Sequence, residues 1–332
     1  MKILIIPYNI DKTTATWKLI NDIESLWNTK KYKIVKYKNN LGKLITLFKL
    51  KIKYPKKEII LMYPLFFLTT MNFLIKLLHI IPTLIWKNKI NLFIYDLPIE
   101  HNKYINWTIP TIFDKIYEKY IFKISSKIFC FNKKMLIYIR KNYNIKKNKI
   151  YTYEILAAFH KYSTNKNNTI YTKWIVYIWN INQNYWLDLN KVKFNLEIFW
   201  ETNNTNQMIN NKIIIKSKVK YNILIEELTK YKFWLVDYSN NIKSYLKYWT
   251  WSKLLIYIIS GLPILVNKEL EYPSYIVKKY KLWIVYSNIN DIPKILKSID
   301  ENKYKKIKKN INNFKATFKT PKSYIKNYLP YF

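Results

Sequence analysis

Short apolar runs alternate with helical segments along the first half of the chain, and this alternation restricts the fold more than any other feature of the sequence. Five apolar runs are predicted as buried strands, at residues 2–6, 32–37, 58–63, 91–95 and 127–131. Helices are predicted at residues 15–27, 44–52, 68–79, 112–124 and 133–142. Strands that alternate with helices are typical of a parallel sheet covered by helices on both faces. The alternation therefore predicts an α/β domain with a doubly wound parallel sheet over residues 1–156.

The same alternation resumes after a polar stretch, HKYSTNKNNT, which favours a linker over residues 157–170. Strands are predicted at residues 174–178, 196–199, 212–215, 233–236, 263–266 and 283–286, and helices at 221–229, 252–260, 273–280 and 292–299. A basic helical segment with Pro321 inside it follows at residues 301–332. We therefore predict two Rossmann-like domains, 1–156 and 171–300, that face each other across a cleft. Such a cleft is the expected binding site.

Lysine dominates the charge of the chain. Lys and Arg total 58 against 20 Asp and Glu, which gives a formal net charge of +38, and Arg140 is the one arginine. Proteins that read nucleic acid favour arginine, because its guanidinium makes bidentate contacts with bases and phosphates. We therefore expect no nucleic-acid partner, and a basic nucleic-acid-binding protein stays open as an alternative. Attraction to an anionic membrane surface or to a phosphorylated substrate fits the charge equally well.

Few residues are available for metal or redox chemistry. Cys130 is the single cysteine, which excludes a disulfide framework and a cysteine zinc site. The histidines lack the spacing of a metal-ligand set; they are His79, His101 and His160. We expect neither a metal nor a cofactor. The first apolar run is too short for a secretory signal, and Pro64 interrupts the apolar stretch 59–74, so we expect a cytoplasmic protein rather than a membrane-spanning one.

Residues 245–266, YLKYWTWSKLLIYIISGLPILV, carry the most chemical information. Ser252 is a favourable N-cap, and Gly261 stands where a helix commonly ends. Lys253 is then in the first turn of a short helix, where free amides, the positive end of the helix dipole and an ammonium group converge. This pattern predicts an anion site at the start of the helix. An exposed lysine on an ordinary helix is the alternative that these residues leave open.

The pattern of this stretch, Tyr-x-x-Tyr followed by Ser-Lys-Leu-x-x-Tyr and Gly-Leu-Pro-Ile, resembles the sugar-nucleotide motif of GT-B glycosyltransferases. It is most similar to that of bacterial glucosyltransferase-3-like enzymes and β-1,6-galactofuranosyltransferases. Weaker matches follow in family order at residues 62–64, 95–100, 131–135 and 280–285. The resemblance covers roughly the whole chain. It implies the GT-B fold, in which two Rossmann-like domains face each other across a cleft.

The resemblance also implies an activity, the transfer of a hexose of the glucose or galactofuranose type. The donor would be a nucleotide-sugar, expected to be UDP-linked, and the acceptor a glycan or glycoprotein in envelope polysaccharide assembly. Lys253 matches the family lysine that contacts the nucleotide diphosphate, and it can stabilise the leaving group without a metal. The other residues expected around the donor, by motif position, are Asn180, Gln183, Phe199, Asp237, Tyr248, Thr250 and Ser252. At Gln183 the family prefers a basic residue, so this contact departs from the pattern.

Asp96 is the second candidate for catalysis. It follows the predicted strand 91–95 and faces the predicted cleft, where it could bind a sugar hydroxyl or act as a base. A carboxylate that caps the following turn is the alternative. The basic surface suits peripheral contact with the inner face of an anionic membrane, beside a lipid-linked acceptor. Association into a homo-oligomer is a further expectation.

Tryptophan stands at several positions where the family has glycine, namely Trp179, Trp200, Trp234 and Trp283. The chain has 12 tryptophans and 2 glycines, whereas ordinary usage would give roughly 23 glycines in this length. We predict that the natural protein carries glycine at most of these 12 positions, through a codon, expected to be UGA, that is read here as tryptophan. If the tryptophans are genuine, Trp249 and Trp251 beside Lys253 favour a GT-B scaffold or regulatory subunit without activity.

Overall fold

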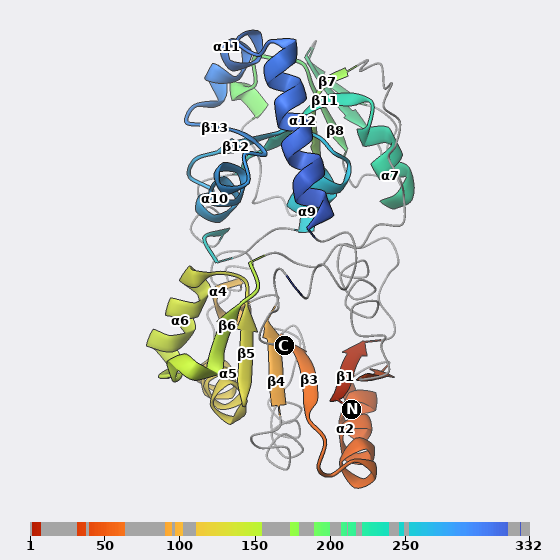
Figure 1. Cartoon of the computed structure of the whole chain (residues 1–332), viewed down its shortest axis with the longest axis vertical. Coiled ribbons are helices and arrows are strands. Elements are labelled where there is room, and N and C mark those ends of the chain that lie inside the picture. The colour runs from red at the N-terminus through yellow and green to blue at the C-terminus, as the bar shows by residue number, and fades with distance from the viewer. Residues whose placement is uncertain are drawn as a thin grey trace. The chain divides into compact units, whose positions relative to one another are not determined.

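The computed structural model divides into two compact units, Met1–Ala157 with Tyr324–Phe332, and Ala158–Ser323 (Figure 1). It describes residues 2–7, 32–37, 40–63, 90–94, 97–101, 111–154, 173–178, 189–199, 207–210, 212–216, 221–238, 246–248, 252–317 and 326. The helices predicted at 15–27 and 68–79, and the predicted linker, lie outside these residues. Among the described helices, none is both long enough and apolar enough to cross a membrane.

The first unit contains a six-stranded sheet whose neighbouring strands all run parallel. Its strands, in spatial order, are β2 (Tyr32–Tyr37), β1 (Lys2–Pro7), β3 (Ile59–Tyr63), β4 (Ile90–Ile94), β5 (Lys127–Cys130) and β6 (Ile150–Thr152). Every residue of β3 and β4 is buried. Continuous burial is expected where a parallel strand is covered on both faces. The predicted parallel sheet is confirmed, and β6, a three-residue strand at its edge, is an addition that the sequence does not predict.

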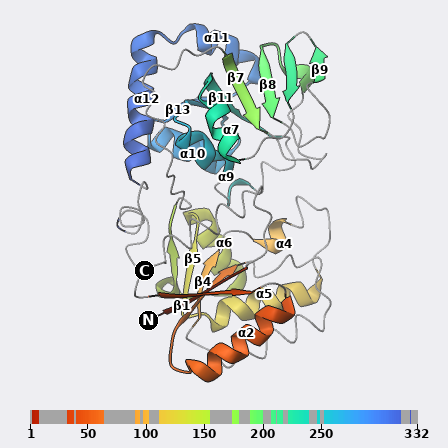
Figure 2. The ribbon, with the colours of Figure 1, turned by 90° about the vertical axis from the view of Figure 1, so that its right-hand side faces the viewer.

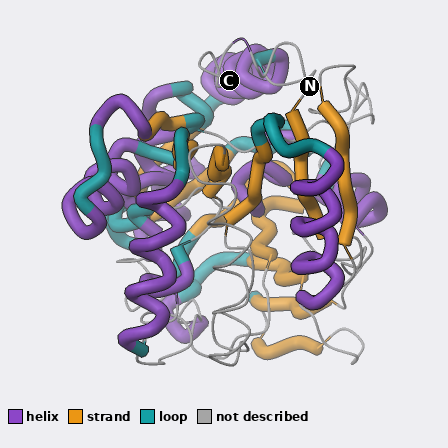
Figure 3. Tube along the Cα trace, turned by 90° about the horizontal axis from the view of Figure 1, so that it is seen from below, coloured by secondary structure: helices purple, strands orange, loops and turns teal. Residues whose placement is uncertain are grey.

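Helices connect these strands and lie beside the sheet (Figures 1 and 3). They are α2 (Asn40–Lys53), α4 (Pro98–His101), α5 (Ile112–Ile124), α6 (Lys133–Tyr143) and the short 3₁₀ helix η3 (Lys147–Lys149). Helix α5 begins with a reciprocal capping box between Thr111 and Asp114. Helix α6 begins at Asn132, whose side chain accepts a 2.8 Å hydrogen bond from the Met135 amide. Local signals of this kind explain why the starts of α5 and α6 are predicted to the residue.

The second unit contains a seven-stranded sheet, and most of its strands are parallel. Its strands, in spatial order, are β13 (Trp283–Tyr286), β12 (Ile264–Asn267), β11 (Tyr231–Val236), β7 (Lys173–Ile178), β8 (Leu196–Phe199), β10 (Ile213–Lys216) and β9 (Gln207–Asn210). Strand β9 pairs antiparallel with β10 at the edge. The sequence does not predict this strand, because four residues at an edge carry little periodicity.

The helices of the second unit are η5 (Leu189–Lys191), α7 (Tyr221–Leu228), α9 (Ser252–Ile259), α10 (Glu271–Lys279), η6 (Ile289–Asp291), α11 (Ile292–Lys297) and α12 (Glu301–Ala316). Helix α12, which falls in the basic helical segment predicted at 301–332, lies along the second unit (Figures 1 and 2). It buries one apolar face, formed by Tyr304, Ile307, Ile311 and Phe314. Its Tyr304 hydroxyl donates to the Lys232 carbonyl oxygen at 3.3 Å. Helix α12 therefore packs against the second unit through its apolar face, and these four side chains belong to the core of that unit.

Candidate functional site

Asp237 directly follows β11 and accepts hydrogen bonds from four residues, although its side chain is only 4% exposed. Its Oδ1 accepts from the Tyr238 amide at 2.7 Å, and its Oδ2 accepts from the Tyr286 hydroxyl at 2.7 Å. The Asn267 side-chain amide donates to both oxygens at 3.1 Å. The Tyr177 hydroxyl donates to the backbone carbonyl of Asp237 at 2.9 Å. We call these five residues the Asp237 hub.

The hub joins the carboxyl ends of four strands that are neighbours in the second sheet. Tyr177 comes from β7, Asn267 is the last residue of β12 and Tyr286 is the last residue of β13. The Asn267 side-chain carbonyl also accepts a 3.0 Å bond from the Glu269 amide, which turns the chain toward α10. In open parallel sheets, ligands bind outside the carboxyl ends of the strands. The hub therefore fixes the edge at which a ligand of this domain would bind.

The tyrosines of the hub stay protonated at neutral pH. Burial raises the pKa of Tyr286 well above its ordinary value of 10.0, and the negative charge of Asp237 raises it further. Burial is also the main cause of the raised pKa of Tyr177. A protonated phenol is a hydrogen-bond donor, so both hydroxyls keep their bonds to Asp237. Donors already occupy both carboxylate oxygens, and the residue is buried. Asp237 therefore holds the strand ends together and does not lie on an open surface.

Helix α9 begins at Ser252, so Lys253 lies in its first turn, as predicted. The helix connects β11 to β12, two parallel neighbours, and therefore runs back against the direction of the strands. Its N-terminus consequently lies on the side of the sheet at which β11 ends. The structure describes the backbone of Ser252 and Lys253 but not their side chains. Tyr248, just before this helix, is buried at 9% exposure, and the Lys247 ammonium lies 4.9 Å from its ring centroid.

The C-terminus of α9 forms the turn that the sequence predicts. Gly261 has φ +72°, in the left-handed region that favours glycine. Its amide donates to the Ile258 carbonyl at 3.0 Å, and the Leu262 amide donates to the Tyr257 carbonyl at 3.2 Å, which is a Schellman motif. The Lys308 ammonium from α12 donates to the Gly261 carbonyl at 2.6 Å. A cation near a helix C-terminus is attracted to the negative end of the helix dipole, so Lys308 of α12 stabilises the C-terminus of α9.

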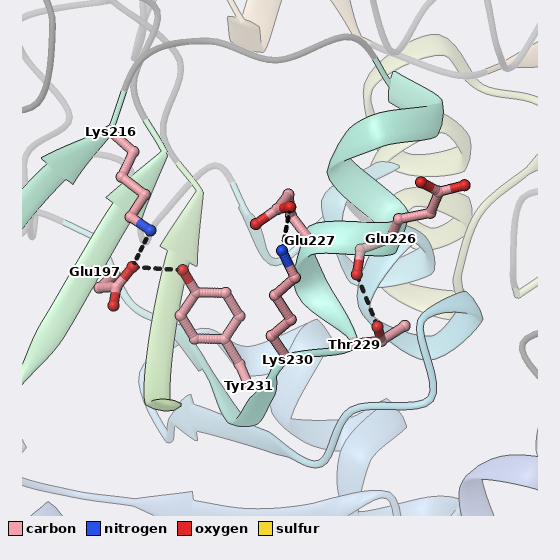
Figure 4. A network of polar contacts seen from close by, with 7 residues as sticks. All are labelled: Glu197, Lys216, Glu226, Glu227, Thr229, Lys230 and Tyr231. Carbon is pink, nitrogen blue, oxygen red and sulfur yellow. Dashed lines mark hydrogen bonds and ion pairs between the residues drawn. The ribbon is translucent and has the colours of Figure 1, made fainter. Parts of the chain in front are cut away.

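Phe199, expected near the donor, ends β8 and is 5% exposed. Its ring meets the Tyr231 ring edge-on at a centroid distance of 6.2 Å, and the Lys216 ammonium lies 5.9 Å from its centroid. The Glu197 carboxylate accepts from Lys216 and from the Tyr231 hydroxyl, each at 2.6 Å (Figure 4). A second pair nearby, Lys230 and Glu227, lies at the end of α7 (Figure 4). The Glu197 carboxylate thus fixes Lys216 and Tyr231, the two side chains that contact the Phe199 ring.

Several predicted site residues lie outside the described part of the chain; they are Asp96, Asn180, Gln183 and Thr250. Of the described ones, Phe199 and Asp237 both lie at carboxyl ends of strands in the second sheet. The structure also shows supporting residues that the sequence does not predict, namely Tyr177, Asn267 and Tyr286. Each is the last or second-last residue of a strand, and this position is the signal that could have identified them.

The first unit presents one further carboxylate after a strand. Glu100 lies in α4, the short helix that follows β4, and is 9% exposed. Its Oε1 accepts a 3.0 Å hydrogen bond from the Tyr138 hydroxyl of α6. Glu100 ends the matched segment 95–100, four residues after Asp96. Within the described residues of both units, no group of three or more His, Cys, Asp or Glu side chains could hold a metal ion.

Comparison with protein families identifies a known domain that the second unit resembles. Residues 175–329 match the model described as "Glucosyltransferase 3-like, C-terminal domain". The matched residues contain the whole Asp237 hub, α9 and α12. The resemblance inferred from the sequence is thereby confirmed. No curated protein sequence matches the chain.

Solved structures resemble the whole chain, not only the matched residues 175–329. The apo form of the lipopolysaccharide outer core galactosyltransferase WaaB matches with a TM-score of 0.59 at 9% identity, and the match covers 100% of each chain. A mutant of T4 phage BGT in complex with UDP-glucose matches with a TM-score of 0.51 at 14% identity, over 99% of each chain. At such identities the likeness shows the fold alone. The fold is GT-B, as predicted.

Proposed function

We propose that this protein transfers a hexose, of the glucose or galactofuranose type, from a UDP-sugar to a glycan or glycoprotein acceptor in envelope polysaccharide assembly. The observation that carries the proposal is the placement of α9 within the matched domain. Its N-terminal turn, with Lys253, lies at the edge of the sheet that the Asp237 hub holds together. Helix N-termini bind phosphate groups through free amides and the helix dipole.

In the proposed reaction, the bond between the anomeric carbon and the diphosphate oxygen breaks as the acceptor oxygen bonds to that carbon. The ammonium of Lys253 and the first amides of α9 stabilise the charge that develops on the departing diphosphate. Asp96 accepts the proton that the acceptor hydroxyl loses. Lysine and amides supply the charge stabilisation, so the proposed step uses no divalent metal.

The remaining donor contacts are assigned by motif position. Asn180, Gln183, Thr250 and Ser252 offer polar groups to the sugar and the phosphates. Phe199 and Tyr248 are 5% and 9% exposed, so each can present only a small part of its surface to a nucleotide. Asp237 is a positioning residue, because its carboxylate holds the strand ends while its partners occupy its oxygens.

Isothermal titration with UDP tests the proposal first, because nucleotide binding separates it from its alternatives. A transferase binds UDP and then hydrolyses or transfers sugar from one member of a UDP-sugar panel. A scaffold that has lost its site binds no UDP, and the tryptophans at 249 and 251 are the observation that favours this second candidate. A nucleic-acid-binding protein prefers polymer to UDP. Absence of UDP binding by folded protein would contradict the transferase assignment.

Peripheral contact with an anionic membrane is part of the proposal, and helix α2 is the surface that supports it. Ile45, Phe48 and Ile52 are 45%, 37% and 82% exposed, at spacings that bring them to one side of the helix. Exposed lysines 49 and 53 lie among them. Apolar side chains beside lysines are typical of helices that lie in a membrane interface. We propose that this face of α2 docks on anionic lipid, beside a lipid-linked acceptor.

A further inference from the structure

Two aromatic rings of the second unit occupy nearly the same space. Trp234, in the middle of β11, and Tyr257, in α9, have ring centroids only 2.9 Å apart at an interplanar angle of 73°. Aromatic pairs pack with centroids about 4.5–7 Å apart. Both side chains are fully buried, so neither can swing into solvent. The space between β11 and α9 is therefore too small for a tryptophan at position 234.

The polar atom of this tryptophan is also unsatisfied. The indole Nε1 of Trp234 is buried and has no hydrogen-bond partner among the described residues, and the same holds for Trp283 at the start of β13. A buried donor without an acceptor costs about 1–3 kcal/mol, and native cores contain few of them. Tryptophan is normally selected in a core for a position where its N–H reaches a partner.

The contrast with the neighbouring residues of β11 shows that the misfit is local. Phe233 packs edge-on against Tyr304 at a centroid distance of 5.8 Å, which is an ordinary aromatic distance. Leu235 and Val236 are fully buried in the same strand. Glycine inside a strand commonly marks a site where another element approaches closely. Position 234 is such a site, because α9 crosses β11 there.

From this geometry we infer that position 234 is glycine in the natural protein. One codon, read as tryptophan in the printed sequence, would then encode glycine at the tryptophan positions in general. Without a side chain at 234 the ring overlap and the unsatisfied indole both disappear. The scarcity of glycine, 2 residues against 12 tryptophans, then has the same cause. This inference concerns the identity of residues and does not depend on the proposed transferase activity.

Glycine in place of tryptophan would also change the chain just before α9. Position 251 directly precedes Ser252 and position 249 lies three residues before it, and both are tryptophan in the sequence. Glycine at these positions would let the backbone approach a phosphate closely, as it does in phosphate-binding turns. The two tryptophans that favour an inactive scaffold would then be absent from the natural protein.

Peptide mass spectrometry of protein purified from the source organism tests the inference directly. Trypsin releases residues 233–243, 248–253 and 282–294 as separate peptides, which cover positions 234, 249, 251 and 283. We expect the masses of glycine at all four positions. Tryptophan in the peptide 233–243 would overturn the inference for position 234, and tryptophan in the other two peptides would overturn it for the class.

Stability measurements on recombinant protein give an independent test. The expected change in thermal midpoint is opposite to the change that truncation of a core side chain normally causes. Removal of a well-packed buried tryptophan destabilises a protein strongly. We expect Trp234→Gly instead to raise the thermal midpoint by about 4 °C or more, or to yield folded protein where the printed sequence yields none. The matched control is Leu235→Gly, the next buried residue of β11, which should lower the midpoint. A fall for Trp234→Gly as large as that for Leu235→Gly would overturn the inference.

Discussion

The Tyr286 hydroxyl donates a 2.7 Å hydrogen bond to Oδ2 of Asp237, and this bond links two strands that are not neighbours in the sheet. Strand β12 lies between them, and its last residue, Asn267, donates to the same carboxylate. One buried side chain thereby holds the ends of β11, β12 and β13 in register. The edge that carries the proposed donor site depends on this contact.

Replacement of Asp237 tests how much the hub contributes to stability. Asp237→Ala leaves the Tyr286 hydroxyl and the Asn267 amide buried without their acceptor, so we expect a loss of about 3 kcal/mol in the free energy of unfolding. Tyr286→Phe removes a single bond and should cost about 1 kcal/mol. Urea denaturation of the whole chain measures both. Equal effects of the two variants would show that Asp237 does not act as the shared acceptor.

Lys253→Ala should reduce activity far more than stability. The loss of one charge opposite a departing diphosphate typically costs on the order of 10²-fold in rate, and we expect an unchanged thermal midpoint. The matched control is Lys308→Ala, which removes the lysine that contacts Gly261 at the other end of α9. This control should lower stability slightly and leave the turnover number unchanged. Lys253→Ala activity within a factor of two of the parent would contradict the assignment.

Transfer should proceed without a divalent metal. The proposed stabilisation of the leaving group uses an ammonium group and backbone amides, and these need no ion. We expect full transfer activity after EDTA treatment, measured with the UDP-sugar that the panel identifies. Loss of activity in EDTA, with recovery on addition of Mg²⁺ or Mn²⁺, would show that the leaving group is stabilised by a metal instead.

Stability should decline in alkaline solution because buried tyrosines must ionise on unfolding. Burial raises the pKa of Tyr177, Tyr257 and Tyr286 above the ordinary value of 10.0. A pKa that is higher in the folded state gives stability that is complete below pH 10 and falls as the pH rises further. Each such tyrosine contributes a slope of about 1.4 kcal/mol per pH unit.

Denaturation measured at several pH values above 10 tests this slope. Tyr286→Phe should lower the dependence of the unfolding free energy on pH by the contribution of one tyrosine. A stability that stays constant above pH 10 would mean that these phenols are not buried in solution.

The exposed face of α2 should bind anionic vesicles. The double variant Phe48→Ser with Ile52→Ser removes two apolar side chains, each worth about 1 kcal/mol or more when buried in an interface. We expect about a tenfold or greater loss of binding to phosphatidylglycerol vesicles in sedimentation assays. Ile223→Ser on α7, a residue that is 42% exposed, is the control and should bind as the parent does. Unchanged binding by the double variant would exclude this face of α2, while UDP binding would still test the transferase separately.

Local signals in the sequence predict much of the fold. Gly261 stands where the chain must adopt a positive φ, and the predicted end of α9 is confirmed there. The side chain of Asn132 caps α6 through a bond to an amide three residues away. Each feature depends on residues within about one helical turn, so a single sequence contains the information.

The sequence by itself determined the alternation of strands and helices, the starts of α5, α6 and α9, and the position of Lys253 in the first turn of α9. Only the tertiary structure decided which residues meet at Asp237, because its partners Asn267, Tyr286 and Tyr177 are 30, 49 and 60 residues away. Strand order determines these contacts, and strand order follows from the packing of the whole domain rather than from local preference. For the same reason only the tertiary structure shows that Trp234 and Tyr257 compete for one space.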